Sequence, residues 1–162
     1  MTAINASFII VPFESRHRDA FRTLNLAWLV GNDLYERADD KQLDDPEGIV
    51  ANGGEIYIAK FDSQVVGTAA LIPLDAHEVE LAKVSVDSEA QGRGIGRALT
   101  THCIERARAR GFHSVVLTTS SKLVAAIRLY ESLGFEHMPI PEWSAYATAD
   151  VAMVLRLHTA VK

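Results

Sequence analysis

Hydrophobic positions in the first third of the chain follow a strand period and then a helix period. Residues 7–11 form a short apolar run that predicts a β-strand. Over residues 16–30 apolar side chains recur at helical spacing, with Ser15 before them and Gly31 after them, which predicts an amphipathic helix with an N-cap and a terminating glycine. A shorter helix is expected over 46–51, because this segment begins with proline, which is favoured at the first helical position.

The middle of the chain consists of apolar, β-branched runs separated by turn residues. The runs at 55–61 and 64–71 are joined only by Asp62 and Ser63, and a third run covers 78–86. Because antiparallel strands can be joined by very short turns, these segments predict an antiparallel meander.

Helical and strand periods alternate in the last part of the chain. Apolar positions at helical spacing over 94–110 predict a long helix, followed by a strand at 115–119, a helix over 123–133 and a last strand at 151–157. A meander followed by this alternation predicts an α/β chain with a mixed sheet and helices packed on it. The last strand is expected at an edge of the sheet, where it would pair across a homodimer or be covered within a monomer.

Length and composition narrow the class of protein. The chain has 162 residues, 48% hydrophobic and 23% charged, as expected for one globular domain over residues 1–162. Its apolar runs are far shorter than the roughly 18 residues that a membrane span needs, and no charged-then-apolar leader opens the sequence. Cys103 is the only cysteine, and no Cys/His cluster has the spacing of a zinc site. We therefore expect a soluble, cytoplasmic protein without a membrane partner, an internal disulfide or a bound metal.

The distribution of charge says more than its sum. A net charge of −5 argues against a nucleic-acid partner, because phosphate binding needs a basic surface. Acidic residues dominate over 33–47, whereas basic residues dominate over 83–110. One region suits a cation and the other an anion, although charge runs of this kind are more often solvated helix faces and loops.

A glycine-rich segment, QGRGIGR at 91–97, lies between a predicted strand and the predicted long helix. Glycines allow the backbone to approach a ligand closely, and the helix N-terminus adds partial positive charge, so this turn predicts an anion site. Neither the dinucleotide pattern G-x-G-x-x-G nor the P-loop pattern fits, because Arg97 occupies the position where each requires another residue. The alternative is a tight strand-to-helix connection that binds no ligand.

The neighbours of this turn together resemble one family. ELAKVSV at 80–86 precedes the turn, Gln91-x-x-Gly94-x-Gly96 forms it, and AIRLYESLGF at 126–135 follows it. This combination resembles the GNAT superfamily of acetyl-CoA-dependent N-acetyltransferases, strongly over 67–135, and the segment 26–49 is similar to a bacterial subgroup of unknown substrate. The resemblance implies the GNAT fold, a mixed and mostly antiparallel sheet of about six to seven strands flanked by about four helices.

The resemblance also implies a cofactor site. In that superfamily the turn binds the pyrophosphate of coenzyme A through backbone N–H groups, and the preceding strand pairs with the pantetheine arm. We therefore expect acetyl-CoA as cosubstrate and no metal. The residues implied in cofactor binding are Val84, Ser85, Val86, Gln91, Gly92, Arg93, Gly94, Ile95, Gly96, Arg97, Ser120 and Ala126. Ser120 or Ser121 is expected to replace an asparagine contact of many relatives, since this chain has Leu123 at that position.

Two residues are candidates for the chemical step. Tyr130 matches the family tyrosine that protonates the departing thiolate, although its helical stripe is also compatible with a core position. The amine must lose a proton, and Glu80 is the leading candidate base because strand alternation places it on the same face as Val84. Glu78 and Glu36 are alternatives, and each of these carboxylates is equally compatible with a surface position.

The activity implied by the resemblance is direct transfer of an acetyl group to a primary amine of an unidentified small-molecule or peptide acceptor. A cationic acceptor is a further hypothesis, since the family fold places the acidic segment 33–47 near the substrate entrance. Acetylation of ribosomal-protein N-termini is disfavoured, because Thr118 stands where those enzymes carry a glutamate. The alternatives are a non-catalytic acyl-CoA-binding sensor or regulatory module, another acyl group or an O-acceptor, and, least compatible, a purely structural protein.

Overall fold

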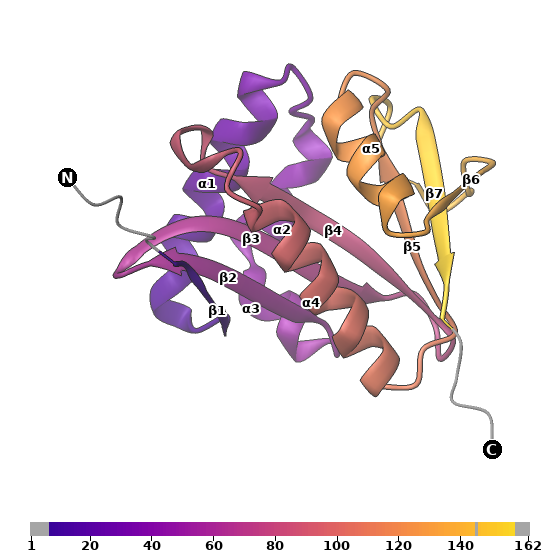
Figure 1. The fold of residues 1–162 in the computed structure, drawn as a ribbon, viewed down its shortest axis with the longest axis horizontal. Coiled ribbons are helices and arrows are strands. Elements are labelled where there is room, and N and C mark those ends of the chain that lie inside the picture. The colour runs from indigo at the N-terminus through magenta and orange to yellow at the C-terminus, as the bar shows by residue number, and fades with distance from the viewer. Residues whose placement is uncertain (1–6, 145, 158–162) are drawn as a thin grey trace.

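The structure, a computed structural model, describes residues 7–144 and 146–157 (Figure 1). Its strands form one sheet with seven members. They are β1 (Ile9–Pro12), β2 (Glu55–Phe61), β3 (Gln64–Pro73), β4 (Glu78–Val86), β5 (Ser114–Thr119), β6 (Glu136–Met138) and β7 (Val151–Arg156).

Five α-helices and three short 3₁₀ turns complete the described part of the chain. The α-helices are α1 (Arg18–Gly31), α2 (Asp40–Asp44), α3 (Pro46–Ala51), α4 (Ile95–Ala109) and α5 (Val124–Ser132). The 3₁₀ turns cover Ser15–His17, Arg37–Asp39 and Ser88–Ala90. None of the helices described is long and apolar enough to cross a membrane.

The order of the strands confirms the predicted mixed and mostly antiparallel sheet. The order is β1-β2-β3-β4-β5-β7-β6, and β4 with β5 is the parallel pair of this sheet. β2, β3 and β4 form the predicted meander. The expectation that the strand near 151–157 lies at an edge is wrong, because β6 pairs with its outer side. The sequence did not predict β6, because this strand is too short and too polar to show an apolar pattern.

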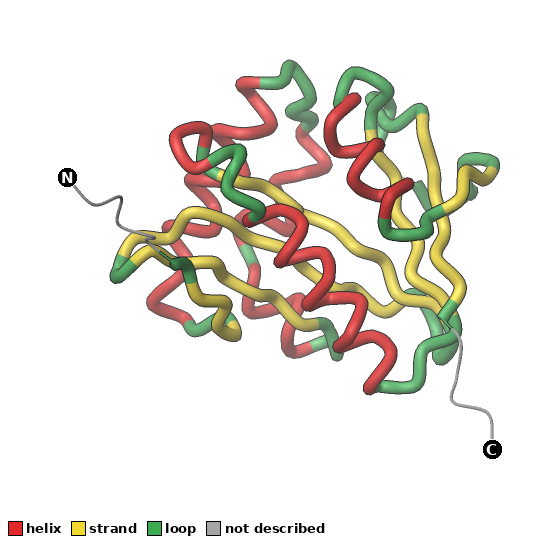
Figure 2. The backbone as a smooth tube through the Cα atoms, in the orientation of Figure 1, coloured by secondary structure: helices red, strands yellow, loops and turns green. Residues whose placement is uncertain are grey.

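Helices cover both faces of the sheet, as Figure 2 shows, with α4 on one side and α1 and α3 on the other. The alternation of β2 explains the arrangement, since successive side chains of a strand point to opposite faces. Tyr57 and Ala59 pack in the core beneath α4, and Ile56 and Ile58 pack in the core beneath α1 and α3. The apolar stripe of α4 includes Cys103, which is fully buried and behaves as a small core residue.

Two irregularities of β4 shape the middle of the sheet. Thr68 pairs with Ser85 and Ala70 pairs with Ala82, so β4 carries an extra residue opposite β3. Lys83 lies in this bulge with a φ of 54°, a left-handed conformation that is costly for a residue with a side chain. On its other edge β4 pairs with β5 only over Glu78–Glu80, and the two strands then diverge (Figure 1).

Candidate functional site

Two cavities lie where β4 and β5 separate. The large cavity, of about 540 Å³, lies between the second half of β4, the turn before α4 and the helix α5. The small cavity, of about 130 Å³, lies between α1, the middle of β4, the end of β5 and the 146–149 segment. Both are lined by Trp28, Val84, Thr119, Leu123 and Tyr130. The cavities therefore meet at these shared residues and can hold two molecules in contact.

The large cavity contains most of the residues predicted to bind a cofactor. Those that line it are Val84, Ser85, Val86, Gln91, Gly92, Gly94, Ile95, Gly96 and Ala126. Gly92 and Gly94 both have a φ of +80°, and open space surrounds the position of an added Cβ at each. Gly94 is the N-cap of α4, whose first N–H groups lack partners within the helix. The turn thus presents backbone donors to an anion without any side chain in the way.

Three predicted cofactor-binding residues have their side chains elsewhere. The Arg97 guanidinium donates to Ser132 Oγ at 2.9 Å, and the Arg93 guanidinium lies 5.5 Å from the centre of the Phe61 ring. Ser120 lines the small cavity, and Ser121 donates its N–H and its hydroxyl to Asp150. Neither Arg93 nor Arg97 lines the large cavity in this structure.

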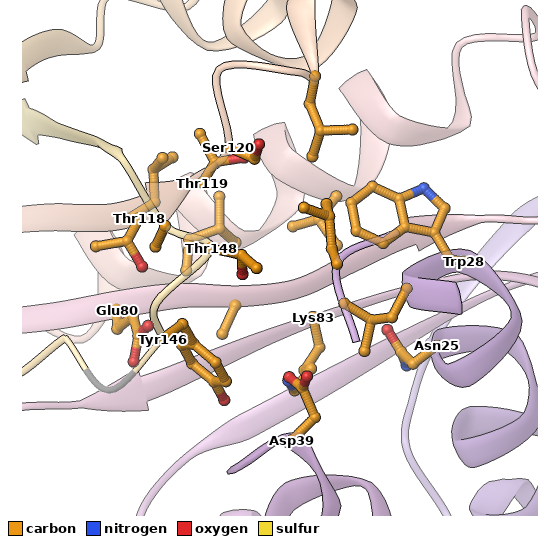
Figure 3. Close-up of a pocket in the computed structure, with 18 of the residues that line it drawn as sticks. Asn25, Trp28, Asp39, Glu80, Lys83, Thr118, Thr119, Ser120, Tyr146 and Thr148 are labelled. Atoms are coloured by element: carbon orange, nitrogen blue, oxygen red, sulfur yellow. The ribbon is translucent and has the colours of Figure 1, made fainter. Parts of the chain in front are cut away.

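The small cavity contains a buried ion pair that the sequence did not suggest. Lys83 Nζ lies 2.9 Å from Asp39 Oδ1, and the two side chains are only 8% and 3% exposed. Regular alternation would place Lys83 on the opposite face of β4 from Glu80, but the bulge changes the phase of the strand. Both side chains consequently line one cavity, as Figure 3 shows.

Glu80 is the one of the three candidate bases that lines this cavity. Burial raises the pKa of its carboxyl to about 7, and the nearby charge of Lys83 opposes that rise. Glu78 instead accepts a hydrogen bond from Ser114 Oγ at 3.2 Å. A carboxylate that titrates near neutral pH can take a proton from a ligand amine and release it to water.

Glu36, the third candidate, joins the two segments that form the outer wall of the small cavity. Its carboxylate accepts hydrogen bonds from the backbone N–H of Ala147 at 3.0 Å, from the N–H of Thr148 at 2.8 Å and from the Thr148 hydroxyl. These hydrogen bonds, with that of the Thr148 hydroxyl the largest, lower the pKa of Glu36. Glu36 therefore holds the 146–149 segment and does not itself line the small cavity.

Tyr146, at the start of the clamped segment, covers the Lys83 side chain. Lys83 Nζ lies 5.3 Å from the centre of the Tyr146 ring, a cation–π distance. Burial, followed by the charge of Asp39, raises the pKa of this tyrosine, so it stays neutral. In Figure 3 Tyr146 lies between Glu80 on one side of the cavity and the Asp39–Lys83 pair on the other.

Tyr130 is placed at the junction of the two cavities. It is 7% exposed, and its ring makes an edge contact with Phe135 at 5.7 Å between centroids. Burial raises the pKa of its hydroxyl to about 12, so the phenol keeps its proton at neutral pH. The side chain is thus both a core residue and part of the cavity wall, and the two interpretations of the sequence are compatible.

A buried network of hydrogen bonds stabilises the bulge of β4. The Thr68 hydroxyl donates to the Lys83 carbonyl at 2.7 Å and accepts from Asn25 Nδ2 at 3.0 Å. Ser85 Oγ donates to Asn25 Oδ1 at 2.9 Å. Because buried polar groups are costly when unpaired, this network holds the left-handed backbone of Lys83 in one arrangement.

Only one of the carboxylates in the acidic segment 33–47 lines the small cavity. Asp39 lines it, but its charge is balanced by Lys83. The other acids have partners outside the cavity. Glu36 binds the 146–149 segment, Asp40 accepts from Tyr35, Asp44 pairs with Arg22, Asp45 caps α3, Glu47 pairs with Arg18, and Asp33 lies 3.8 Å from Lys122. The segment as a whole is therefore not a free negative surface facing the cavity.

Sequence reasoning missed several polar residues of the small cavity. These are Asn25, Asp39, Gln42, Lys83, Tyr146 and Thr148. Asp39 and Gln42 belong to a short 3₁₀ turn and α2, which the hydrophobic pattern did not predict. Tyr146 and Thr148 lie in a segment without periodic signal. The acidic character of 33–47 was the single signal that pointed toward this part of the wall.

Comparison with known proteins places this arrangement in a family. The model of the acetyltransferase (GNAT) family matches residues 18–135. N-acetylaspartate synthetase from Rattus norvegicus is 43% identical over 90 residues, 53% of this chain and 29% of that protein. The uncharacterized N-acetyltransferase YjgM from Escherichia coli is 34% identical over 103 residues, 61% of this chain and 62% of that protein. The chain thus spans less than two thirds of these relatives.

Solved structures share the fold over nearly the whole chain. A putative acetyltransferase from Salmonella typhimurium, solved with its cofactor acetyl-CoA, is 26% identical with a TM-score of 0.73, covering 96% of this chain and 97% of that one. A GNAT-family acetyltransferase from Staphylococcus aureus is 21% identical with a TM-score of 0.86, covering 94% of this chain and all of that one. The second similarity shows the fold alone.

Proposed function

Because the chain belongs to the GNAT acetyltransferase family, we propose that it transfers the acetyl group of acetyl-CoA to a primary amine by direct attack. The observation that carries this proposal is the junction of the two cavities at Tyr130 and Val84, with Glu80 in the wall of the small one. Acetyl-CoA in the Salmonella relative and the N-acetyltransferase names of other relatives support it.

The residues of the large cavity fit coenzyme A. Open space around Gly92 and Gly94 and the free N–H groups of α4 suit a pyrophosphate. The edge of β4 beyond Glu80 has no partner strand in the described sheet, so Val84 to Val86 can pair with an extended arm in the manner of strand addition. When bound, acetyl-CoA would supply a thioester whose carbonyl carbon accepts a nucleophile.

The proposed chemistry uses Glu80, Val84 and Tyr130 in turn. Glu80 takes a proton from the acceptor ammonium, which frees the nitrogen lone pair. A carbon–nitrogen bond then forms at the acetyl carbonyl while the backbone N–H of Val84 stabilises the oxygen. The carbon–sulfur bond breaks, Tyr130 gives its proton to the departing sulfur, and the second proton lost by nitrogen restores Tyr130 through solvent. The products are the N-acetyl amine and the free thiol of coenzyme A.

Thermal unfolding with acetyl-CoA, coenzyme A, NADH and ATP in parallel tests cofactor binding. A ligand at about 100 times its Kd stabilises a protein by about 2.7 kcal/mol, or roughly 5–10 °C in Tm for a chain of this size. We expect a shift with both coenzyme A species and none with NADH or ATP. No shift with acetyl-CoA would contradict the proposal.

Release of free thiol from acetyl-CoA in the presence of amines tests the catalytic step. A non-catalytic acyl-CoA-binding module would give the same thermal shift without amine-dependent thiol release. We expect release that depends on the amine and yields the N-acetyl product by mass.

A further inference from the structure

The small cavity limits the size of the acceptor. Its volume of about 130 Å³ is slightly below the roughly 150 Å³ of a protein cavity that holds one benzene molecule, so it accommodates about six non-hydrogen atoms. The 146–149 segment covers one side of the cavity, where Glu36 binds the N–H groups of Ala147 and Thr148, and the cavity opens elsewhere toward solvent and the large cavity. A small acceptor therefore fits inside this volume, and the 146–149 segment obstructs a bulky extension on its side of the cavity.

Once Glu80 is ionised, the charges in the wall leave one negative charge in excess. Among the described residues that line the small cavity, Asp39, Glu80 and Lys83 carry charge. Asp39 Oδ1 lies 2.9 Å from Lys83 Nζ, and Asp39 Oδ2 accepts the backbone N–H of Glu36 at 2.9 Å. Both oxygens of Asp39 thus already accept a hydrogen bond, whereas the Glu80 carboxylate remains available for one ammonium group. Uncompensated charge in a buried site is costly, so the wall matches a ligand with one positive charge.

Polar groups with unused capacity line the same cavity as the ion pair. An ammonium has three donors, and Asp39 accepts one donor of Lys83 at 2.9 Å. Gln42 Oε1 is buried and has no hydrogen-bond partner among the described residues. Gln42 and Asp39 are three residues apart at the start of α2 and line the same cavity. A hydroxyl can accept from Lys83 and donate to Gln42, which neither a methyl group nor a second ammonium can do.

We infer that the acceptor of the proposed acetyl transfer is a small amino alcohol, a primary amine with one positive charge, no carboxylate and a hydroxyl at its far end. This inference rests on the proposed function and names its substrate class. The ammonium group pairs with Glu80, and the hydroxyl binds between Lys83 and Gln42. Polyamines are disfavoured because their second ammonium would face Lys83, and amino acids because their carboxylate would add a second uncompensated negative charge.

Four primary amines of equal size test the inference with the full-length wild-type chain. They are 4-aminobutan-1-ol, pentan-1-amine, 1,4-diaminobutane and 3-aminopropanoate. A fifth compound, Nα-acetyl-lysine amide, serves as a bulky probe with one positive charge on its side-chain amine. The measurement is kcat/KM from thiol release at saturating acetyl-CoA, with the product confirmed by mass. We expect the amino alcohol to exceed the diamine, the amino acid and the lysine probe at least tenfold, and to exceed pentan-1-amine several-fold.

Any other order of the probes by kcat/KM overturns the inference. A diamine, an amino acid or the lysine probe at or above the amino alcohol would show that charge and size do not select as the cavity suggests. Parity between the amino alcohol and pentan-1-amine would remove the hydroxyl contact. If none of the probes is acetylated, the inference fails. A thermal shift with acetyl-CoA in the same sample then leaves the proposed acetyl transfer standing, and the lack of such a shift overturns that proposal too.

Variants of the ion pair test the charge argument directly. Lys83→Met removes the cation, so 1,4-diaminobutane should gain at least tenfold relative to 4-aminobutan-1-ol. Asp39→Asn removes the anion, so 3-aminopropanoate should gain instead. The double variant restores one negative charge in excess, so the diamine and the amino acid should both fall below the amino alcohol again, although the Lys83 contact to the hydroxyl is lost. Circular dichroism and Tm establish that each variant is folded, and unchanged relative rates in folded single variants would overturn the role of the pair.

Discussion

The surroundings of Glu80 shift the pKa of its carboxyl into the range in which it can transfer protons near neutral pH. Burial raises its pKa from 4.5 to about 7, so we expect kcat/KM for the acceptor to fall as the pH drops below about 7. Glu80→Gln should lower the rate and remove this limb of the pH profile. Glu78→Gln, on the same strand but outside the cavity, is the matched control and should keep both. An unaltered profile in Glu80→Gln would assign the proton transfer to another group.

The same pKa has a consequence for stability with a defined sign. Between pH 4.5 and about 7 the native carboxyl keeps a proton that the unfolded chain has lost. Stability falls with rising pH wherever the native state binds more protons, so Glu80 destabilises the native state progressively over this window. The Tm difference between Glu80→Gln and the wild type should therefore be larger at pH 8 than at pH 4.

Tyr130 is placed to act on the leaving group without holding the cofactor. Tyr130→Phe keeps the ring and its edge contact with Phe135 but removes the hydroxyl. A positioned acid typically contributes about 10²- to 10⁴-fold, so we expect kcat to fall at least tenfold with little change in the Kd for acetyl-CoA. Stopped-flow thiol release and calorimetric titration measure the two quantities. Unchanged turnover would remove the tyrosine from the mechanism.

At the scale of elements, α4 begins and ends on a left-handed glycine. Gly94, its N-cap, has a φ of +80°, and Gly111, just past its C-cap, has a φ of +83°, both with open space around an added Cβ. Alanine at either position should cost about 1–2 kcal/mol through backbone strain. Gly94 also lines the large cavity. We expect similar losses of Tm from Gly94→Ala and Gly111→Ala, and a several-fold weaker Kd for acetyl-CoA from Gly94→Ala alone.

The clamp at Glu36 connects two segments that lie far apart in the sequence. Its carboxylate binds Ala147 and Thr148, which are 111 and 112 residues away. Glu36→Gln replaces one acceptor oxygen by a donor, so the wall of the small cavity should loosen. KM for the acceptor should rise several-fold while the Kd for acetyl-CoA stays the same. Glu47→Gln, which alters a surface ion pair with Arg18, should change neither.

At the scale of the whole molecule, the sheet consists of a larger and a smaller part that separate beyond Glu80. β1 to β4 continue on one side, and β5, β7 and β6 on the other. A ligand along the free edge of β4 would bridge the two parts. We expect acetyl-CoA to slow amide hydrogen exchange in 84–86 and 92–97 and to leave exchange across the β1–β2 strand pair unchanged. Equal exchange with and without acetyl-CoA in these segments would place the cofactor elsewhere.

Local sequence patterns determined much of this protein. The helix over Pro46–Ala51 and the strands at Glu55–Phe61 and Glu78–Val86 have the predicted bounds, because proline, turn residues and apolar runs act over a few neighbouring positions. The turn around Gly94 was also predicted from the sequence, because the spacing of glycines next to the start of a helix is a local property. α2 and β6 were missed, because each is too short to carry a period.

Tertiary structure alone decided which charged groups share the small cavity. Regular alternation would place Lys83 on the opposite face of β4 from Glu80. The bulge that brings both side chains to one cavity arises from the pairing of β4 with β3 and from the hydrogen bond of Thr68 to the Lys83 carbonyl. Asp39 meets Lys83 across 44 residues of sequence. Such pairings depend on the register of strands and the packing of distant segments, and these do not follow from the period of any one element. The sequence by itself thus determined the order of elements and the glycine turn, whereas the fold determined the charge of the cavity.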